Sequence, residues 1–364
     1  MAMPMLAGAS FSCARPCASQ TASPLPRTHL PAARRQRRPA AQCRAVPSFI
    51  PAEPAAEVEE PAARAMLNAM QRVQLQVPGL AGPVHTTFVG PQQPGPPDSA
   101  RPAFILLHGF DSSLLEFRRF QPLLATLGDA YAVDLAGWGF SDCGFAGNPQ
   151  QELGPPQKRA HLRSFVEQVV GRPVVLLGAS LGGAVAVDFA LEHPELVQKL
   201  VLVDAQGFID GIGPMAAMPR ALSVLGVQVL RTVALRQMAN KMAYADKQRY
   251  ATDDAMRVGR LHTHMPGWTD ANVAFMRSGG YSLSQRLKDV ACPALVVWGR
   301  QDEILSTDYA QRFLDVLPDA RLVWVEECGH VPALEQPQRL LDAVAEFVGV
   351  AAPAAAAQPA GAAS

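Results

Sequence analysis

A serine placed between two glycines is the side chain of this sequence best suited to nucleophilic chemistry. Ser180 lies in Gly178-Ala179-Ser180-Leu181-Gly182, directly after the apolar run Val174–Leu177 and before a helix-forming stretch that stops at Pro194. On a one-residue corner between a strand and a helix, a serine adopts a positive φ, and only small residues fit two positions to either side. The corner exposes the hydroxyl above the helix N-terminus, which favours a developing negative charge. The pattern predicts a serine nucleophile; the alternative is a serine in a structural turn.

Two other kinds of glycine-rich loop do not fit the sequence. A phosphate-binding loop ends in Gly-Lys-Ser/Thr, and no lysine follows Ser180 in this way. A dinucleotide-binding loop has three glycines in the pattern G-x-G-x-x-G, and Gly137-Trp138-Gly139-Phe140-Ser141-Asp142 lacks the third. We therefore expect neither nucleotide chemistry nor a bound cofactor.

A serine hydroxyl becomes a good nucleophile when a base removes its proton and an acid orients that base. Asp302 follows the predicted strand Ala294–Trp298, and His330 follows the predicted strand Arg321–Val325. Parallel strands end at the same edge of a sheet, so we expect both side chains to lie near Ser180. Asp204, at the end of another predicted strand, stays open as the alternative acid.

Acyl transfer also needs donors for the oxyanion of the tetrahedral intermediate. The backbone N–H of Leu181, directly after the nucleophile, is one candidate. The second is the N–H of Phe110, because His108-Gly109-Phe110 follows the predicted strand Ala103–Leu107 and Gly109 permits a tight bend. His108 is then expected to brace this loop and not to act as a base.

The elements that would position these residues alternate between strands and helices. This alternation predicts an α/β fold with a mostly parallel central sheet flanked by helices. The predicted strands are Val84–Val89, Ala103–Leu107, Ala130–Asp134, Val174–Leu177, Leu200–Asp204, Ala294–Trp298 and Arg321–Val325. The predicted helices are Ala62–Arg72, Phe117–Leu127, Gln157–Val170, Leu181–Glu192, Asp308–Leu317 and Pro337–Val348.

One segment interrupts the alternation. Residues 207–290 show helical patterns at Pro219–Val233, Arg236–Arg249 and Asp270–Met276 and no convincing strand. We interpret this segment as a helical cap inserted into a core formed by residues 84–206 and 291–349. Of the cap histidines, we expect none to act as the base, and His262 at most to touch a substrate. Methionines adapt to irregular apolar surfaces, so the seven in the cap suggest a lid over an apolar cavity, although they could equally pack the helices together: Met215, Met218, Met238, Met242, Met256, Met265 and Met276.

Composition sets the ends of the chain apart from its middle. The net charge of the 364 residues is zero, which gives no indication of a nucleic-acid partner, yet residues 1–45 hold seven arginines and no Asp or Glu. Their Ala/Ser/Pro/Arg composition predicts a chloroplast transit peptide cleaved near Cys43; the alternative is a basic tail that stays on the protein. We expect residues 46–83 to be a flexible segment and residues 350–364 a disordered tail.

The cysteines and the hydropathy of the chain bear on disulfides, metal sites and membrane-spanning segments. The cysteines beyond residue 45 are Cys143, Cys292 and Cys328, which form no Cys-x-x-Cys pair, so neither a disulfide scaffold nor a metal site is indicated. No run of 18 apolar residues occurs, so we expect no membrane-spanning segment, while peripheral membrane contact stays open.

Five motifs in this order resemble those of the α/β-hydrolases, with the nucleophile, acid and base in the order Ser180, Asp302, His330. The resemblance runs from Val84 to Val348, and the whole chain is similar to uncharacterised plastid α/β-hydrolases of plants and green algae. It implies a Ser-His-Asp hydrolase without naming its substrate. A serine, where epoxide hydrolases and haloalkane dehalogenases have aspartate, argues against those two chemistries. The motifs are His108-Gly109-Phe110, Asp134 to Asp142, the Ser180 corner, Trp298 to Asp302 and Gly329-His330.

These observations predict a cofactor-independent serine hydrolase that acts on a carboxylic ester or a related acyl compound with an apolar part. Two other functions stay open. One is a non-catalytic ligand-binding protein on the same fold, because fold alone does not decide function. The other is an acyltransferase or a C–C bond hydrolase that uses the same three residues.

Overall fold

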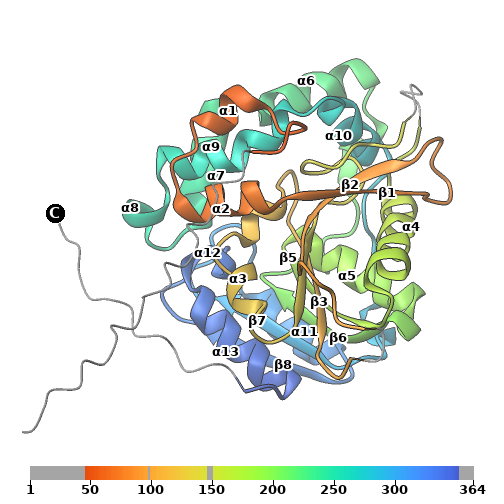
Figure 1. Cartoon of the computed structure of the whole chain (residues 1–364), viewed down its shortest axis with the longest axis vertical. Helices are drawn as coiled ribbons and strands as arrows, with labels where there is room; N and C mark the ends of the chain where they lie inside the picture. The colour runs from red at the N-terminus through yellow and green to blue at the C-terminus, as the bar shows by residue number, and fades with distance from the viewer. Residues whose placement is uncertain (1–45, 97–98, 146–150, 352–364) are drawn as a thin grey trace, which may run out of the picture. The chain divides into compact units, whose positions relative to one another are not determined.

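The computed structural model describes residues 46–351, with gaps at 97–98 and 146–150. The predicted transit peptide and nearly all of the predicted tail lie outside these residues. The described chain is built on one eight-stranded sheet with the order β1-β2-β4-β3-β5-β6-β7-β8 (Figure 1). The strands are β1 (Gln71–Leu75), β2 (Val84–Val89), β3 (Ala103–Leu107), β4 (Asp129–Val133), β5 (Val174–Ala179), β6 (Val197–Val203), β7 (Ala294–Gly299) and β8 (Ala320–Val325).

The sheet is mostly parallel. Only β1 with β2, and β2 with β4, pair antiparallel, whereas the remaining neighbours pair parallel. Every residue of β3, β4, β5 and β7 is buried, which explains why these strands are nearly continuous apolar runs in the sequence. The predicted fold class is therefore confirmed.

Two apolar cores lie on opposite faces of the sheet, because successive side chains of a strand point to opposite sides. In β5, for example, Val174 and Leu176 belong to one core and Val175 and Leu177 to the other. The first core is covered by α4 (Pro155–Phe165), α5 (Leu181–Glu192) and α11 (Asp308–Val316). The second is covered by α2 (Pro61–Ala69), α3 (Gln121–Leu124) and α13 (Pro337–Val348).

The segment before β2 differs from the expectation of flexibility. Residues 46–83 contain α1 (Ala52–Ala56), α2 and β1, and Ile50, Val58 and Leu67 are almost completely buried. Both carboxylate oxygens of Glu60 accept hydrogen bonds, from Nε of Arg118 at 2.6 Å and from Nε of Arg119 at 2.7 Å. The helix predicted at Ala62–Arg72 corresponds to α2, whereas the few apolar residues before it, such as Ile50 and Val58, gave no periodic signal although they anchor the segment.

Between β6 and β7 the chain forms five helices in the upper part of Figure 1. Two of them, α6 and α10, form a small core in which Val227, Trp268 and Val273 pack together. One of them, α9, was not predicted, because its sequence Asp-Asp-Ala-Met-Arg-Val-Gly-Arg is mostly polar and contains a glycine. The helices are α6 (Arg220–Leu230), α7 (Val233–Ala243), α8 (Lys247–Tyr250), α9 (Asp253–Arg260) and α10 (Trp268–Arg277). Across the described parts of the chain, no helix combines the length and apolar character that crossing a bilayer requires.

Candidate active site

Ser180 occupies the corner between β5 and α5 in a strained backbone conformation. Its φ of 51° and ψ of −121° lie outside the regions that ordinary L-residues favour. Backbone hydrogen bonds hold it there: its N–H donates to the carbonyl of Val203 at 3.0 Å, and its carbonyl accepts from Gly183 N at 3.0 Å and from Gln206 N at 2.9 Å. The surrounding structure therefore fixes the serine with its hydroxyl at the end of the parallel strands.

The two glycines beside Ser180 are required by close backbone contacts. A Cβ at Gly178 would lie 2.2 Å from the carbonyl oxygen of Gly182. A Cβ at Gly182 would lie 2.0 Å from the carbonyl oxygen of Leu107 at the end of β3. Because these neighbours are backbone atoms of buried elements, no side chain fits at either position.

Asp302 and His330 form a buried acid–imidazole pair on the loops that follow β7 and β8. Nδ1 of His330 donates to Oδ2 of Asp302 at 2.8 Å, and Oδ1 of Asp302 accepts from the N–H groups of Ile304 at 2.7 Å and Leu305 at 3.0 Å. The Asp302 side chain has no solvent exposure. With the proton on Nδ1, the Nε2 atom of His330 is free to accept a proton from another group.

Ser180 and His330 line the same cleft, whose volume is about 390 Å³. The cleft lies between the carboxyl end of the sheet and α7, which contributes Ala239 and Ala243. No methionine lines it among the described residues, which argues against a role of the methionines in covering the cleft. Met276 packs in the small core of the cap, as the alternative interpretation has it. Met215, Met238 and Met242 instead point outward and are exposed.

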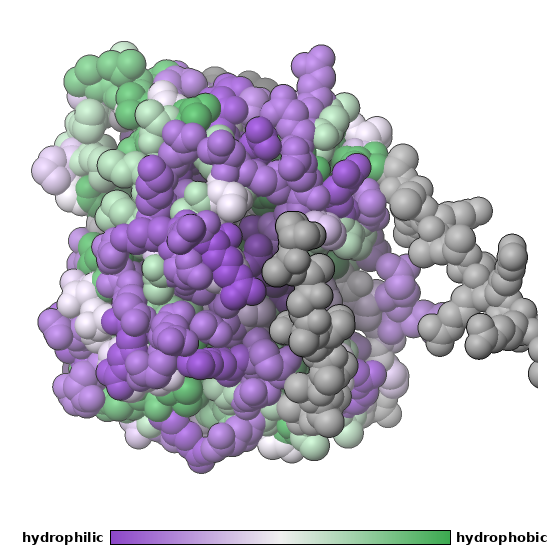
Figure 2. All heavy atoms as spheres, turned by 90° about the vertical axis from the view of Figure 1, so that its left-hand side faces the viewer, coloured by the Kyte–Doolittle hydropathy of each residue, from purple (hydrophilic) through white to green (hydrophobic). Residues whose placement is uncertain are grey.

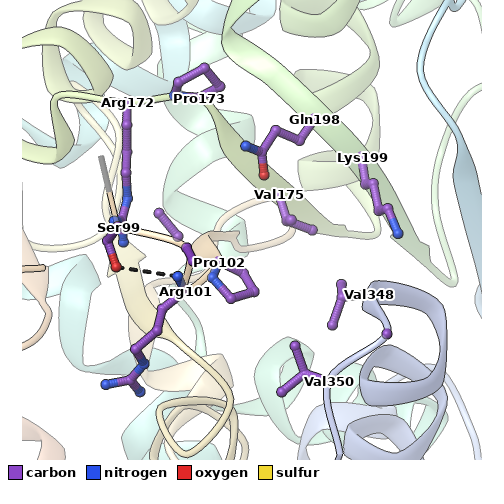
Figure 3. Close-up of a pocket in the computed structure, with 13 residues that line it drawn as sticks. Ser99, Arg101, Pro102, Arg172, Pro173, Val175, Gln198, Lys199, Val348 and Val350 are labelled. Atoms are coloured by element: carbon purple, nitrogen blue, oxygen red, sulfur yellow. Dashed lines mark hydrogen bonds between the residues drawn. The ribbon is translucent and has the colours of Figure 1, made fainter. Parts of the chain in front are cut away.

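A second cavity of similar size, about 360 Å³, lies at the opposite end of the sheet (Figure 3). Its walls come from residues before or at the starts of β3, β5 and β6, including Arg101, Pro173 and Lys199, and from the end of α13. Ligands of open α/β sheets bind at the carboxyl ends of the strands. We therefore place the candidate site in the cleft that holds Ser180 and His330.

Asp204, the alternative acid, lies behind Asp302. Its Oδ1 accepts a hydrogen bond from Gly299 N at 2.9 Å, and it does not line the cleft. Burial first, and then the neighbouring charge of Asp302, raise the pKa of Asp204 well above its usual range. Asp302, and not Asp204, is the carboxyl group that contacts the imidazole of His330.

Asp204, Asp302 and His330 bring one ligand atom each to within 4.8 Å of one another. This spacing alone would suit a small cation. The hydrogen bond between His330 and Asp302, and the raised pKa of Asp204, instead favour a hydrogen-bonded network, because metal ligands must be deprotonated and free to coordinate.

The predicted oxyanion loop passes close to the nucleophile. A Cβ at Gly109 would lie 3.1 Å from Cβ of Ser180. The Gly109 N–H donates to Glu116 at 3.1 Å, and Nδ1 of His108 donates to the Gly109 carbonyl at 2.8 Å. Within the described chain, the N–H groups of Phe110 and Leu181 have no hydrogen-bond partner. Both are thus free to bind an anion, and His108 braces the loop as expected.

Asp111, directly after Phe110, was not singled out by the sequence. Its buried carboxylate accepts hydrogen bonds from Trp268 Nε1 at 2.9 Å, from His262 Nε2 at 3.1 Å and from Arg236. Burial opposes its ionisation, but His262 and Arg236 more than offset this and lower the pKa of Asp111. The loop is thereby tied to the helices above the sheet. His262 is buried in this contact and does not line the cleft, so its expected position near a substrate was wrong.

Glu335 was also missed, and it joins the loop of His330 to the end of α7. Its carboxylate accepts from Gly329 N at 2.7 Å, Ala245 N at 3.2 Å and Asp246 N at 2.7 Å. In addition, His330 N donates to the carbonyl of Ala243 at 2.8 Å. In the sequence, the only indication of this contact is a glutamate five residues after the histidine; its burial is seen only in the structure.

Comparison with known proteins shows which sequences and structures the chain is similar to. The chain is 36% identical over 325 residues to the alpha/beta hydrolase domain-containing protein VTE7 of Arabidopsis thaliana, covering 87% of this chain and 94% of that protein. It is 29% identical over 262 residues to a 2-hydroxy-6-oxononadienedioate/2-hydroxy-6-oxononatrienedioate hydrolase of Cupriavidus pinatubonensis, covering 67% of this chain and 86% of the relative.

Among solved structures, the chain is similar to a thermophilic esterase from Thermogutta terrifontis. The TM-score is 0.64 at 20% identity, over 77% of this chain and 98% of the esterase, a likeness that concerns the fold. The family model described as "Alpha/beta hydrolase family" matches residues 104–343, more than half of the chain. The chain therefore belongs to the α/β-hydrolase family.

Proposed function

We propose that this protein is a serine hydrolase that cleaves a carboxylic ester or a related acyl compound with an apolar part. The observation that carries the proposal is the arrangement in one cleft of a half-buried serine with a strained backbone and a histidine that contacts a buried carboxylate. This is the arrangement that nucleophilic acyl transfer requires.

In the proposed mechanism, Nε2 of His330 takes the hydroxyl proton of Ser180 as the oxygen attacks the substrate carbonyl. Asp302 stabilises the imidazolium that forms. The N–H groups of Phe110 and Leu181 bind the oxyanion, and each such donor is worth about 3 kcal/mol of transition-state stabilisation. His330 returns the proton to the leaving alcohol, and then activates water to release the acid from Ser180.

The test is covalent labelling with a fluorophosphonate probe, read by mass spectrometry. We expect the label on Ser180, none on Ser180→Ala, and unchanged labelling of Ser112→Ala, a matched control because Ser112 lines the same cleft. Hydrolysis of a chromogenic ester should fall at least about a thousandfold in Ser180→Ala. A folded wild type that takes no label and binds esters without turnover would instead indicate a ligand-binding protein.

C–C bond hydrolysis is the second candidate, because a relative that covers two thirds of this chain is a hydrolase of 2-hydroxy-6-oxononadienedioate. It would use the same three residues, with a carbon leaving group in place of an alcohol. Product analysis separates the two: we expect an acid and an alcohol from an ester, and no turnover of a vinylogous 1,5-diketone. Adding an alcohol acceptor would reveal acyl transfer as a new ester.

We also propose a chloroplast location. The support is the acid-free, arginine-rich composition of residues 1–45 and the plant origin of a relative that matches most of the chain. A fluorescent protein fused behind residues 1–45 should enter plastids, and the same fusion with its arginines changed to glutamate should not.

A further inference from the structure

Helix α6 is apolar on both of its sides. Its inner side packs through Val227 against Trp268. Its outer side carries Leu222, Leu225 and Val229, whose exposed fractions are 51%, 63% and 50%. Their spacing of three and four residues forms one continuous stripe along the helix. An α-helix of a soluble protein normally turns a polar face to water, so this stripe indicates a surface that is covered in use.

Helix α7 extends the same kind of surface. Val233, Met238 and Met242 are exposed on it. We call the six residues of α6 and α7 the cap apolar face. They account for six of the eleven large hydrophobic side chains that are exposed in the described residues, so the exposure is concentrated and not scattered. Figure 2 shows hydrophobic residues gathered at the top of the molecule, the end at which Figure 1 places α6.

The charge of this segment is one-sided. Residues 211–245 contain four basic residues and no Asp or Glu. Lys241 is exposed on α7, between Met238 and Met242. Arg220 is paired with the exposed Asp270 and Arg236 with the buried Asp111, whereas Lys241 has no ion pair among the described residues. Exposed apolar side chains beside an exposed cation suit the interface of an anionic bilayer, where the apolar residues enter the acyl boundary and the cation meets the headgroups.

We propose that the cap apolar face docks on a lipid bilayer and that the substrate is an amphiphile taken from that bilayer. Helix α7 supports this, because it carries part of the apolar face and also lines the cleft through Ala239 and Ala243. Phe110 and Ile304, two further exposed apolar residues, line the same cleft. A rigid protein partner on α7 would cover the route into the cleft, whereas a bilayer both covers the face and supplies an apolar ester. The docking stands by itself; the delivery of an ester to Ser180 rests on the proposed function.

The test is flotation of the full-length protein with vesicles of phosphatidylcholine alone, and of phosphatidylcholine mixed with phosphatidylglycerol. Leu222→Glu/Leu225→Glu should lower the vesicle-partition constant at least about tenfold, because two apolar anchors become charged. Val46→Glu, the same kind of change at an exposed apolar residue outside the face, should leave it unchanged. High salt weakens any vesicle binding through the arginines of residues 1–45. The lower partition constant of the double variant must therefore also be seen at high salt.

Activity provides a second, separable measurement. The double variant should keep its rate on a short soluble ester and lose turnover of a long-chain ester embedded in vesicles. If no variant hydrolyses any ester, the proposed function fails while flotation still tests the docking. The docking is overturned if the wild type never floats. It is also overturned if the wild type is a dimer by light scattering and the double variant a monomer, because the face would then join two copies of the chain.

Discussion

Asp204 and Asp302 are two acids buried close together, and burial raises the pKa of Asp204 well above its usual range. Two acids at the end of neighbouring strands cannot both ionise cheaply when both are buried. Asp302 accepts hydrogen bonds from two backbone N–H groups and from the imidazole of His330, whereas Asp204 accepts one from a backbone N–H. The number of donors around each carboxyl thus decides which acid is the partner of the histidine.

We therefore expect Asp204→Asn to raise the free energy of unfolding relative to the wild type, by an amount that grows as the pH rises. The pKa of Asp204 is raised in the fold, so its contribution to stability is fully present below the unfolded value of 3.8 and is lost as the pH rises above it. Asparagine cannot ionise and avoids this loss. Urea unfolding of both proteins at several pH values should show a difference in unfolding free energy that grows with pH. A difference that does not change with pH would contradict the assignment.

At the scale of elements, the loop after β3 is held by side chains of α7 and α10. Asp111 adopts a φ of 48°, and its carboxylate and carbonyl both accept from Arg236 on α7, while Trp268 at the start of α10 donates to the same carboxylate. The loop that presents the Phe110 N–H is therefore positioned by helices that lie more than a hundred residues further along the chain.

Asp111→Asn should lower stability and catalysis together. Removing one partner of a buried charge cluster costs about 3 kcal/mol, because Arg236 is left without its counter-ion. If Phe110 N–H binds the oxyanion, kcat should fall about tenfold or more with little change in KM. A double-mutant cycle with Trp268→Phe should give a coupling of about 1–3 kcal/mol.

The control is Asp210→Asn, because Asp210 is an exposed acid that also accepts bonds from backbone N–H groups, those of Leu283 and Ser284. It should leave kcat unchanged. Equal losses of kcat in both variants would show that Asp111 has no special effect on the loop.

The elements that the sequence predicted best have sharp boundaries. For β3, α5 and α13 the predicted ends equal the observed ones, because an apolar run or periodic stretch meets Gly or Pro at its limits. The same signals located the loops of Asp302 and His330, which the structure brings together. The contacts of Asp111 had no such signal, since its partners lie 125 to 157 residues away in sequence. Likewise, the segment between α1 and α2 is held by contacts across the fold, those of Glu60 with Arg118 and Arg119, and not by local pattern.

At the scale of the whole molecule, two buried bases make the fold sensitive to acid. His161 and Lys158, both on α4, are completely buried. Nε2 of His161 donates to the Thr86 hydroxyl at 2.6 Å, and Nζ of Lys158 donates to the Ala136 carbonyl at 2.9 Å. Burial first, and then the nearby Lys158, lower the pKa of His161 to about 3.

The protein should therefore lose stability as the pH falls from about 6.5, the unfolded pKa of histidine, toward about 3. In this range His161 binds a proton in the unfolded chain but not in the folded state. His161→Gln can still donate to Thr86 and does not titrate. Its unfolding free energy, measured by chemical denaturation, should fall less steeply with pH over this window. Parallel curves for the two proteins would show that another group governs the acid response.

The attachment of α7 to the loop of His330 limits how the site can open. The chain from Ala243 to Asp246 is fastened to that loop through the carbonyl of Ala243 and through Glu335. If α7 moved away from the sheet at this end, the loop of His330 would move with it. The imidazole would then leave the cleft just as a substrate entered. We therefore expect the motions that admit a substrate to be confined to α6 and the chain before it. Ser180, Asp302 and His330 would then keep their relative positions throughout turnover.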